Sequence, residues 1–231
     1  MKRVAILVLA VALMVATAMA VVQSSLKRTG KVGDTYTFDL KANMTFQGEK
    51  IDLSAKVIER LTAIADDGSY AVGSVQKEAK MVVMGQEYPT SEFGETVTKY
   101  DPNGEILEIT GDQVDGSTYR FASLINLRRP SKDVTKGDKW EVKSPANAKT
   151  GLIALTATYE VEGNENVSGI DCLKINFTIT ETEGSAPASS KGTLWVNPAN
   201  GLTVKVSGEL KNAPIGGQVV EAKFSTTLIK S

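Results

Sequence analysis

Histidine is absent from this chain of 231 residues, and cysteine occurs once. Without histidine, a serine–histidine triad, a histidine-ligated zinc site and the most common general base are all excluded. The lone Cys172 cannot form an intramolecular disulfide, so the folded chain must depend on a packed core. A nucleophilic thiolate needs a base beside it, so we expect Cys172 to be an inert thiol on a strand.

Carboxylates are the groups that remain for catalysis or metal binding. The stretch 101–105 offers oxygen ligands but lacks the spaced acidic residues of a calcium loop, which predicts a plain β-turn. Three acidic pairs fall in turns or at strand ends, where we expect solvent to surround them. These pairs are Asp66 with Asp67, Asp112 with Asp115, and Glu181 with Glu183. We therefore expect no enzymatic activity, no cofactor and no bound metal ion.

The chain also lacks a basic block. It has 26 Lys and Arg residues against 27 Asp and Glu residues, and its densest basic spot is the isolated pair Arg128-Arg129. Nucleic-acid binding depends on clustered basic side chains that neutralise phosphates. We therefore exclude nucleic acid as a partner.

No apolar run is long enough for a typical membrane span. The longest, Val4–Val15, falls short of the roughly 20 residues that a spanning helix needs. Two basic residues precede it and Ala18-Met19-Ala20 follows, the pattern of a secretory signal peptide. We predict a signal peptide over residues 1–20, export to the periplasm or outside the cell, and no membrane span after cleavage. A membrane anchor is the alternative, and Val21 in place of cysteine argues against a lipoprotein.

Alternation of apolar and polar residues fills most of what remains. Residues 35–46 alternate almost perfectly, and residues 51–64 and 70–84 continue the pattern, with a change of phase near Gly73 that suggests a β-bulge. Strands with one polar face are typical of antiparallel sheets. We predict an all-β fold with a minor helix: a curved antiparallel sheet or half-barrel of about ten strands.

Three sequence features occur twice, in the same order, which predicts two pseudo-repeats at about 31–115 and 130–231 within one β domain, 21–231. Each repeat opens on a glycine-aspartate turn, carries a similar apolar strand, and contains a turn ending in glycine. The pairs are Gly33-Asp34 with Gly137-Asp138, 53–59 with 155–161, and 101–104 with 197–201.

One stretch between the repeats breaks the alternation. Residues 117–129 place apolar side chains at near-helical spacing before Pro130, and Asp115 or Ser117 can cap the start. We predict a short helix that links the repeats and covers the concave face of the sheet.

The repeat openers carry a resemblance to known proteins. The segment 130–140, with its Gly137-Asp138-Lys139-Trp140 strand opener, and the turn 100–106 resemble a family of uncharacterised secreted bacterial proteins. At the level of architecture, such curved sheets are similar to the LolA and LppX group of lipoprotein or lipid carriers. The resemblance implies a fold and a carrier-like role, and it implies no catalytic residues.

A half-closed sheet must cover its apolar inner face with a helix, a partner or a ligand. Our first hypothesis is therefore a non-catalytic binding module that holds an apolar small molecule or lipid. The alternative is a structural or interaction protein with a filled core and no ligand, and a hydrolase using carboxylates ranks third. The sequence identifies no protein partner. The residues expected to line the binding site are Phe38, Leu40, Met44, Phe46, Met81, Val83, Phe121, Leu124 and Ile125.

Overall fold

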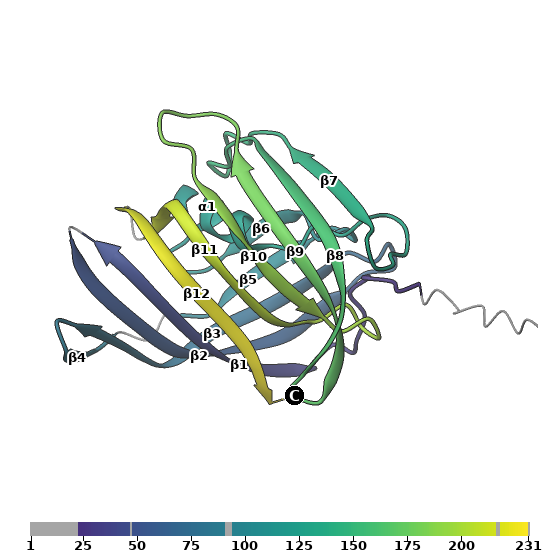
Figure 1. Ribbon diagram of the computed structural model, residues 1–231, viewed down its shortest axis with the longest axis horizontal. Helices are drawn as coiled ribbons and strands as arrows, with labels where there is room; N and C mark the ends of the chain where they lie inside the picture. The colour runs from purple at the N-terminus through teal and green to yellow at the C-terminus, as the bar shows by residue number, and fades with distance from the viewer. Residues whose placement is uncertain (1–22, 47, 91–93, 216–217, 231) are drawn as a thin grey trace, which may run out of the picture.

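The computed structural model describes residues 23–46, 48–90, 94–215 and 218–230. Within these ranges, twelve strands and one helix form the fold (Figure 1). The strands are β1 (Thr35–Phe46), β2 (Glu49–Ile64), β3 (Tyr70–Val83), β4 (Gln86–Pro89), β5 (Thr96–Tyr100), β6 (Ile106–Thr110), β7 (Lys139–Ser144), β8 (Leu155–Val167), β9 (Ile170–Glu181), β10 (Ser189–Val196), β11 (Thr203–Ile215) and β12 (Gln218–Lys230). The helix is α1 (Gly116–Ile125). The predicted signal peptide lies outside the described residues.

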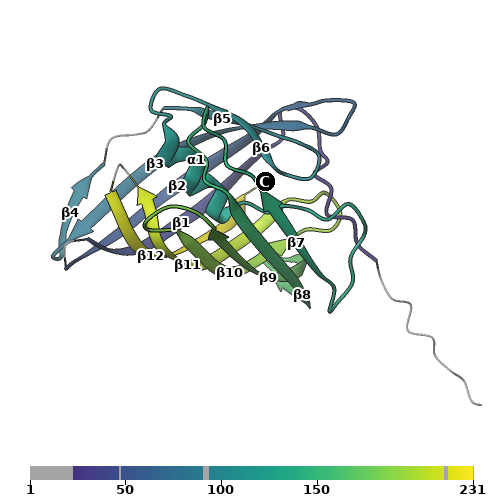
Figure 2. The ribbon, with the colours of Figure 1, turned by 90° about the horizontal axis from the view of Figure 1, so that it is seen from above.

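The strands form one antiparallel sheet that remains open. Its order is β6-β5-β3-β2-β1-β12-β11-β10-β9-β8-β7, with β4 attached beside β3. Neighbours in the chain are mostly neighbours in the sheet, and the exceptions are the pairings of β3 with β5 and of β1 with β12. The sheet curves strongly, and α1 lies on its concave side (Figure 2). The predicted all-β half-barrel is therefore confirmed.

Side chains alternate between the two faces as the sequence predicts. Strands β1 and β2 pair without a break from Thr35↔Arg60 to Phe46↔Glu49, so Leu40, Ala42 and Met44 share one face. The change of phase in β3 occurs at Glu78, whose φ is 52°, where the register with β2 shifts. A second register shift, between Leu61 and Ala63 of β2, lies opposite Val72 and Ala71, next to the expected position at Gly73.

The two glycine-aspartate turns make matching backbone hydrogen bonds. Gly33 N donates to Leu61 O over 2.8 Å, and Gly137 N donates to Val161 O over 2.8 Å. In each turn the aspartate carboxylate accepts a hydrogen bond, over 2.8 Å, from an amide three residues earlier. These contacts explain why the same residues open both segments, while the division into two pseudo-repeats stays a prediction.

Helix α1 follows β6 in the chain and packs mainly against β11. Asp115 caps its first turn, where its side chain accepts a hydrogen bond from Thr118 N over 2.9 Å. The helix ends at Ile125, earlier than the expected residue 129. Asn126 is extended, Arg129 N donates to Asn103 O, and a residue before proline disfavours the helical conformation. Within the described ranges, no helix has the length and apolar character needed to cross a membrane.

Candidate functional site

The helix covers one half of the concave face and leaves the other half open. Helix α1 packs against β11, β10 and β9, and Ser190 Oγ donates a hydrogen bond to Leu124 O. Beneath the helix the inward side chains are completely buried, as for Ala157, Ile175 and Ile179 at 0% exposure. This half of the face is an ordinary protein core.

Strands β1, β2 and β3 present the uncovered half, which we call the trough. Cross-strand neighbours on this face include Met44 with Ile51 and Leu53 with Met81. Unlike their counterparts under the helix, these apolar side chains remain half-buried. The half-buried apolar residues of the trough are Leu40, Met44, Ile51, Leu53, Val57, Met81 and Val83.

The residues predicted to line the site divide between trough and core. Leu40, Met44, Met81 and Val83 belong to the trough. Phe38 is buried in a cluster with Tyr36 and Leu228, and Leu124, which belongs to α1, is completely buried in the core that the helix covers. Phe121 and Ile125 are half-buried and pack against the same core as Met44. Phe46 ends β1, but its side chain lies outside the described ones.

Polar groups occupy the end of the trough at which β1 begins. Glu59 lies between Tyr36 and Ser74 across the strands and is half-buried. Burial raises the pKa of its carboxyl group, and the nearby charge of Arg28 opposes this shift. Among the described residues, no group hydrogen-bonds to the Glu59 carboxylate. Sequence reasoning missed this residue, although it continues the apolar phase of Leu53 and Val57, and a charge in that phase is the signal that could have found it.

Tyrosines surround this polar end. Tyr100 stacks on Tyr70 with ring centroids 4.9 Å apart. Burial, and then the neighbouring Tyr70 and Glu59, raise the pKa of Tyr100. Both hydroxyls therefore remain protonated at neutral pH, so Tyr100 and Glu59 can hydrogen-bond to a polar group that enters the trough.

Arg129 closes the same end of the trough. Its guanidinium donates to Leu26 O over 2.6 Å, to the Tyr70 hydroxyl over 2.8 Å and to Gly201 O over 3.1 Å. It thereby joins the N-terminal segment, β3 and the turn after β10. The sequence marked Arg128 and Arg129 as an isolated basic pair, and the structure shows that both are buried.

The prediction that solvent surrounds all three acidic pairs is wrong for Glu181. Its side chain is buried, receives two hydrogen bonds of 2.7 and 2.6 Å from Arg120, and accepts one from Ala188 N. These contacts anchor α1 to β9, so the residue is structural. Asp66, Asp67, Asp112 and Glu183 are exposed, as expected, and Asp115 caps the helix.

Metal binding and thiol chemistry gain no support. Within the described part of the chain, no group of three or more His, Cys, Asp or Glu side chains could hold a metal ion. The Asp101 carboxylate accepts a hydrogen bond from Glu105 N over 2.7 Å, as in a plain turn. Cys172 is 1% exposed, and burial raises the pKa of its thiol to about 11.

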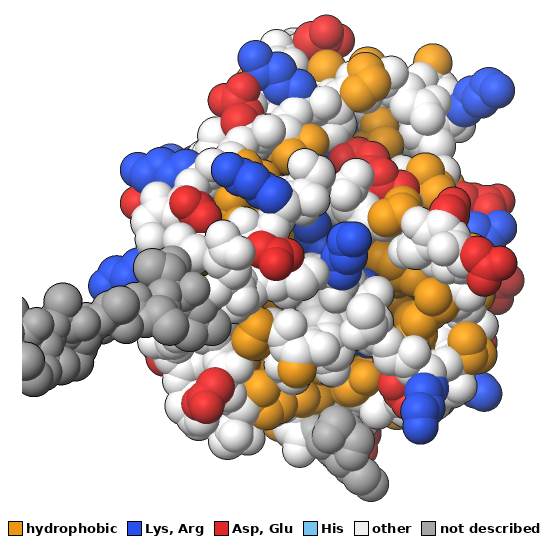
Figure 3. Space-filling model, turned by 90° about the vertical axis from the view of Figure 1, so that its right-hand side faces the viewer, with side chains coloured by type: hydrophobic (Ala, Val, Ile, Leu, Met, Phe, Trp, Pro, Cys, Tyr) orange, Lys and Arg blue, Asp and Glu red, His pale blue; other side chains and the backbone are white. Residues whose placement is uncertain are grey.

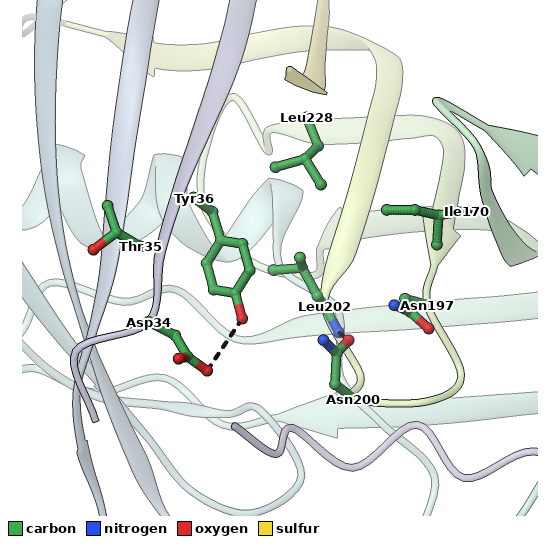
Figure 4. Close-up of a pocket in the computed structure, with 8 residues that line it drawn as sticks. All are labelled: Asp34, Thr35, Tyr36, Ile170, Asn197, Asn200, Leu202 and Leu228. Atoms are coloured by element: carbon green, nitrogen blue, oxygen red, sulfur yellow. Dashed lines mark hydrogen bonds between the residues drawn. The ribbon is translucent and has the colours of Figure 1, made fainter. Parts of the chain in front are cut away.

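Two cavities lie outside the trough. The first, of about 320 Å³, is bounded by the start of β1, the β8–β9 hairpin and the turn after β10. Figure 4 shows the Tyr36 hydroxyl pointing toward the Asp34 carboxylate, 3.5 Å away. Its two asparagines already bond within their own turn, through Ala199 N and Leu202 N. These bonds use the side-chain oxygens of the asparagines and leave their amide donors facing a cavity that is otherwise lined largely by apolar and turn residues.

The second cavity, of about 470 Å³, lies between β7 and the segment 128–132. Basic and acidic side chains line it together, including Lys132, Lys143 and Glu141. The face of the molecule seen in Figure 3 has the same mixed character, with red and blue side chains interspersed among apolar ones. Neither the cavity nor this face has the single-sign charge of a nucleic-acid site.

Comparisons with known proteins yield fold-level likenesses. No protein-family model matches the chain, and no curated protein matches it. A structure describing lipid–protein interactions in lipovitellin is similar over 85% of this chain, with 13% identity and a TM-score of 0.49. The chain spans 25% of the length of that protein.

Two bacterial structures are also similar, at 16% identity each. The hypothetical lipoprotein YmcC from Escherichia coli matches 85% of this chain over 84% of its own, with a TM-score of 0.32. A DUF1329 family protein from Desulfovibrio piger matches 86% over 85%, with a TM-score of 0.24. Because all three TM-scores are below 0.5, we base no functional argument on them. The resemblances to the secreted family and to LolA and LppX stay predictions.

Proposed function

We propose that this protein is an exported, non-catalytic binding module that holds the apolar chain of a lipid or similar molecule in the trough. The observation that carries the proposal is the contrast between the two halves of one concave face. Inward side chains under α1 reach 0% exposure, whereas seven inward apolar side chains of β1, β2 and β3, among them Leu40, Met44 and Met81, stay half-buried. A ligand that covers the second set would remove apolar area from water at about 25 cal/mol per Å².

The polar end of the trough supports an amphipathic ligand. The carboxyl group of Glu59 and the hydroxyl of Tyr100 lie beyond the apolar residues, near Arg28. We propose that a polar head occupies this end, while the apolar chain extends along Leu53 and Met44 toward the β3–β4 hairpin. Head and chain would then each meet side chains of their own polarity.

The alternative is a structural or interaction protein with no small-molecule ligand. The observation that favours it is that both cavities described above lie outside the trough. Side chains that shift slightly toward one another could then complete the core without a ligand. The two functions differ in one measurable property, which is the binding of an acyl chain.

Binding of a fluorescent fatty acid to the mature chain tests the proposal. We expect micromolar affinity, displacement by unlabelled fatty acid, and a loss of about tenfold or more in Met44→Trp, which fills the trough. Thr45→Trp is the matched control, because Thr45 is the exposed neighbour on the opposite face. If the wild type binds no probe, or both variants bind equally well, the trough is not a binding site. Native mass spectrometry of the purified protein would identify lipid that co-purifies.

A further inference from the structure

The turn of the β3–β4 hairpin contains a residue that is poorly suited to its position, Met84. Val83 pairs with Gln86, so Met84 and Gly85 form a two-residue turn, with φ values of 52° and 81°. Such turns favour Asn-Gly, because a side chain other than Asn or Asp is strained at positive φ. Met84 is also 83% exposed, the highest exposure among the large apolar side chains described. Met84 therefore has a strained backbone conformation and an apolar side chain that is exposed to water.

The tip continues the apolar lining of the trough. Val83 and Met81 lie in the trough opposite Ile51 and Leu53, and Met84 follows directly. Figure 1 shows this hairpin projecting at the end of the molecule where β1 and β2 also meet. An apolar path therefore leads from the trough to the tip.

Behind the tip lies a band of amphipathic and charged side chains. Tyr88, opposite Met81 on β4, is 45% exposed and its hydroxyl donates to Gln86 over 2.8 Å. Lys80 and Glu87 form an ion pair of 2.9 Å. An apolar tip followed by tyrosine and charged groups matches the order of a bilayer interface, where tyrosine lies at the level of the headgroups.

We infer that the β3–β4 hairpin docks on a phospholipid surface, with Met84 inserted at the boundary between headgroups and acyl chains. Docking would bring the open end of the trough to the membrane, where an apolar chain could pass without crossing water. Lys80 and Glu87 of the hairpin pair with each other, so zwitterionic lipid is sufficient and the interaction does not depend on salt. The passage of an apolar chain into the trough rests on the proposed function. The docking of the hairpin does not, and it is measured separately.

A dye placed at the tip tests the docking. Met84→Cys, labelled with an environment-sensitive dye, is mixed with phosphatidylcholine vesicles. Native Cys172 is buried with a raised pKa, so the label goes to position 84. Val32→Cys is the matched control, because Val32 is 63% exposed in a turn beside β1, at the other end of the strands. We expect a blue shift at position 84 and none at position 32, unchanged in high salt.

Met84→Asn separates docking from folding. Asparagine suits the turn, so the thermal midpoint should stay the same or rise, while vesicle co-sedimentation should weaken about tenfold. The inference is overturned if the label at position 84 stays in water, if position 32 responds equally, if salt abolishes the response, or if Met84→Asn sediments like the wild type. Fatty-acid binding by Met84→Asn in solution reports on the proposed function alone, so the two failures are distinguishable.

Discussion

At the scale of single residues, hydrogen-bond partners decide which charged groups enter the interior. Arg128 is 1% exposed and donates to Glu105 and Ser144, and Glu181 is buried against Arg120. Each of these charges has a partner of opposite sign from a distant segment. Glu59 differs, because its carboxylate has no hydrogen-bond partner among the described residues, and burial raises its pKa.

Glu59→Gln should stabilise the protein above the ordinary glutamate pKa, with the gain growing as pH rises. The folded-state pKa is raised above 4.5, so below that value both states hold the proton and the penalty is absent. As pH increases, the unfolded chain releases its proton first, and the wild type loses stability until the raised pKa is passed. Urea unfolding at pH 4 and pH 8 measures the difference.

The control for this pair of measurements is Glu49→Gln, at the exposed start of β2. It should change the free energy of unfolding by less than about 0.5 kcal/mol at either pH. Equal unfolding energies of wild type and Glu59→Gln at pH 8 would show that the Glu59 carboxyl is well solvated.

At the scale of elements, α1 is begun by local sequence and ended by tertiary contacts. The Asp115 cap lies within three residues of its partner Thr118, so it is visible in the sequence. The C-terminal end of the helix depends on hydrogen bonds that the following segment makes to distant groups. One example is the bond that Arg128 N donates to the Tyr159 hydroxyl. Tertiary contacts also place the helix over β9–β11, where Leu124 is its most buried side chain.

Leu124→Ala should destabilise the protein by about 2 to 5 kcal/mol, because it leaves a cavity where a fully buried side chain packed against the core. Thermal or urea unfolding measures the loss. Leu107→Ala on β6, where the side chain is 57% exposed, is the control and should cost less than about 0.5 kcal/mol. Similar losses in the two variants would mean that α1 is not anchored through Leu124.

At the scale of the whole molecule, β6 and β7 end the sheet among the described strands, and β4 is paired on one side, so other segments must hold the ends of the sheet together. Helix α1 joins the two halves through the core, and Ser24 pairs with Val134 in an isolated bridge. Arg129 adds its three hydrogen bonds between segments that lie far apart in sequence. The curvature that creates the trough therefore depends on contacts outside the sheet.

Arg129→Ala should cost about 3 kcal/mol or more in free energy of unfolding, since it leaves Leu26 O and Gly201 O without a buried donor. Arg129→Lys should lose most of the same free energy of unfolding, because an ammonium group cannot reproduce the planar geometry of guanidinium. Lys132→Ala, at an exposed position nearby, is the control. A wild-type unfolding midpoint in Arg129→Lys would contradict the role of guanidinium geometry.

The sequence by itself determined the local features of this protein. Alternation with a period of two fixed the strand faces, glycine-aspartate pairs fixed the turns, and Asp115 fixed the start of the helix, because each of these depends on neighbours in the chain. Tertiary structure decided that Thr37 pairs with Lys230, that α1 covers one half of the concave face, and that Arg129 and Glu181 are buried. These outcomes depend on distant segments competing for the same apolar surface and the same hydrogen-bond partners, which no local pattern records.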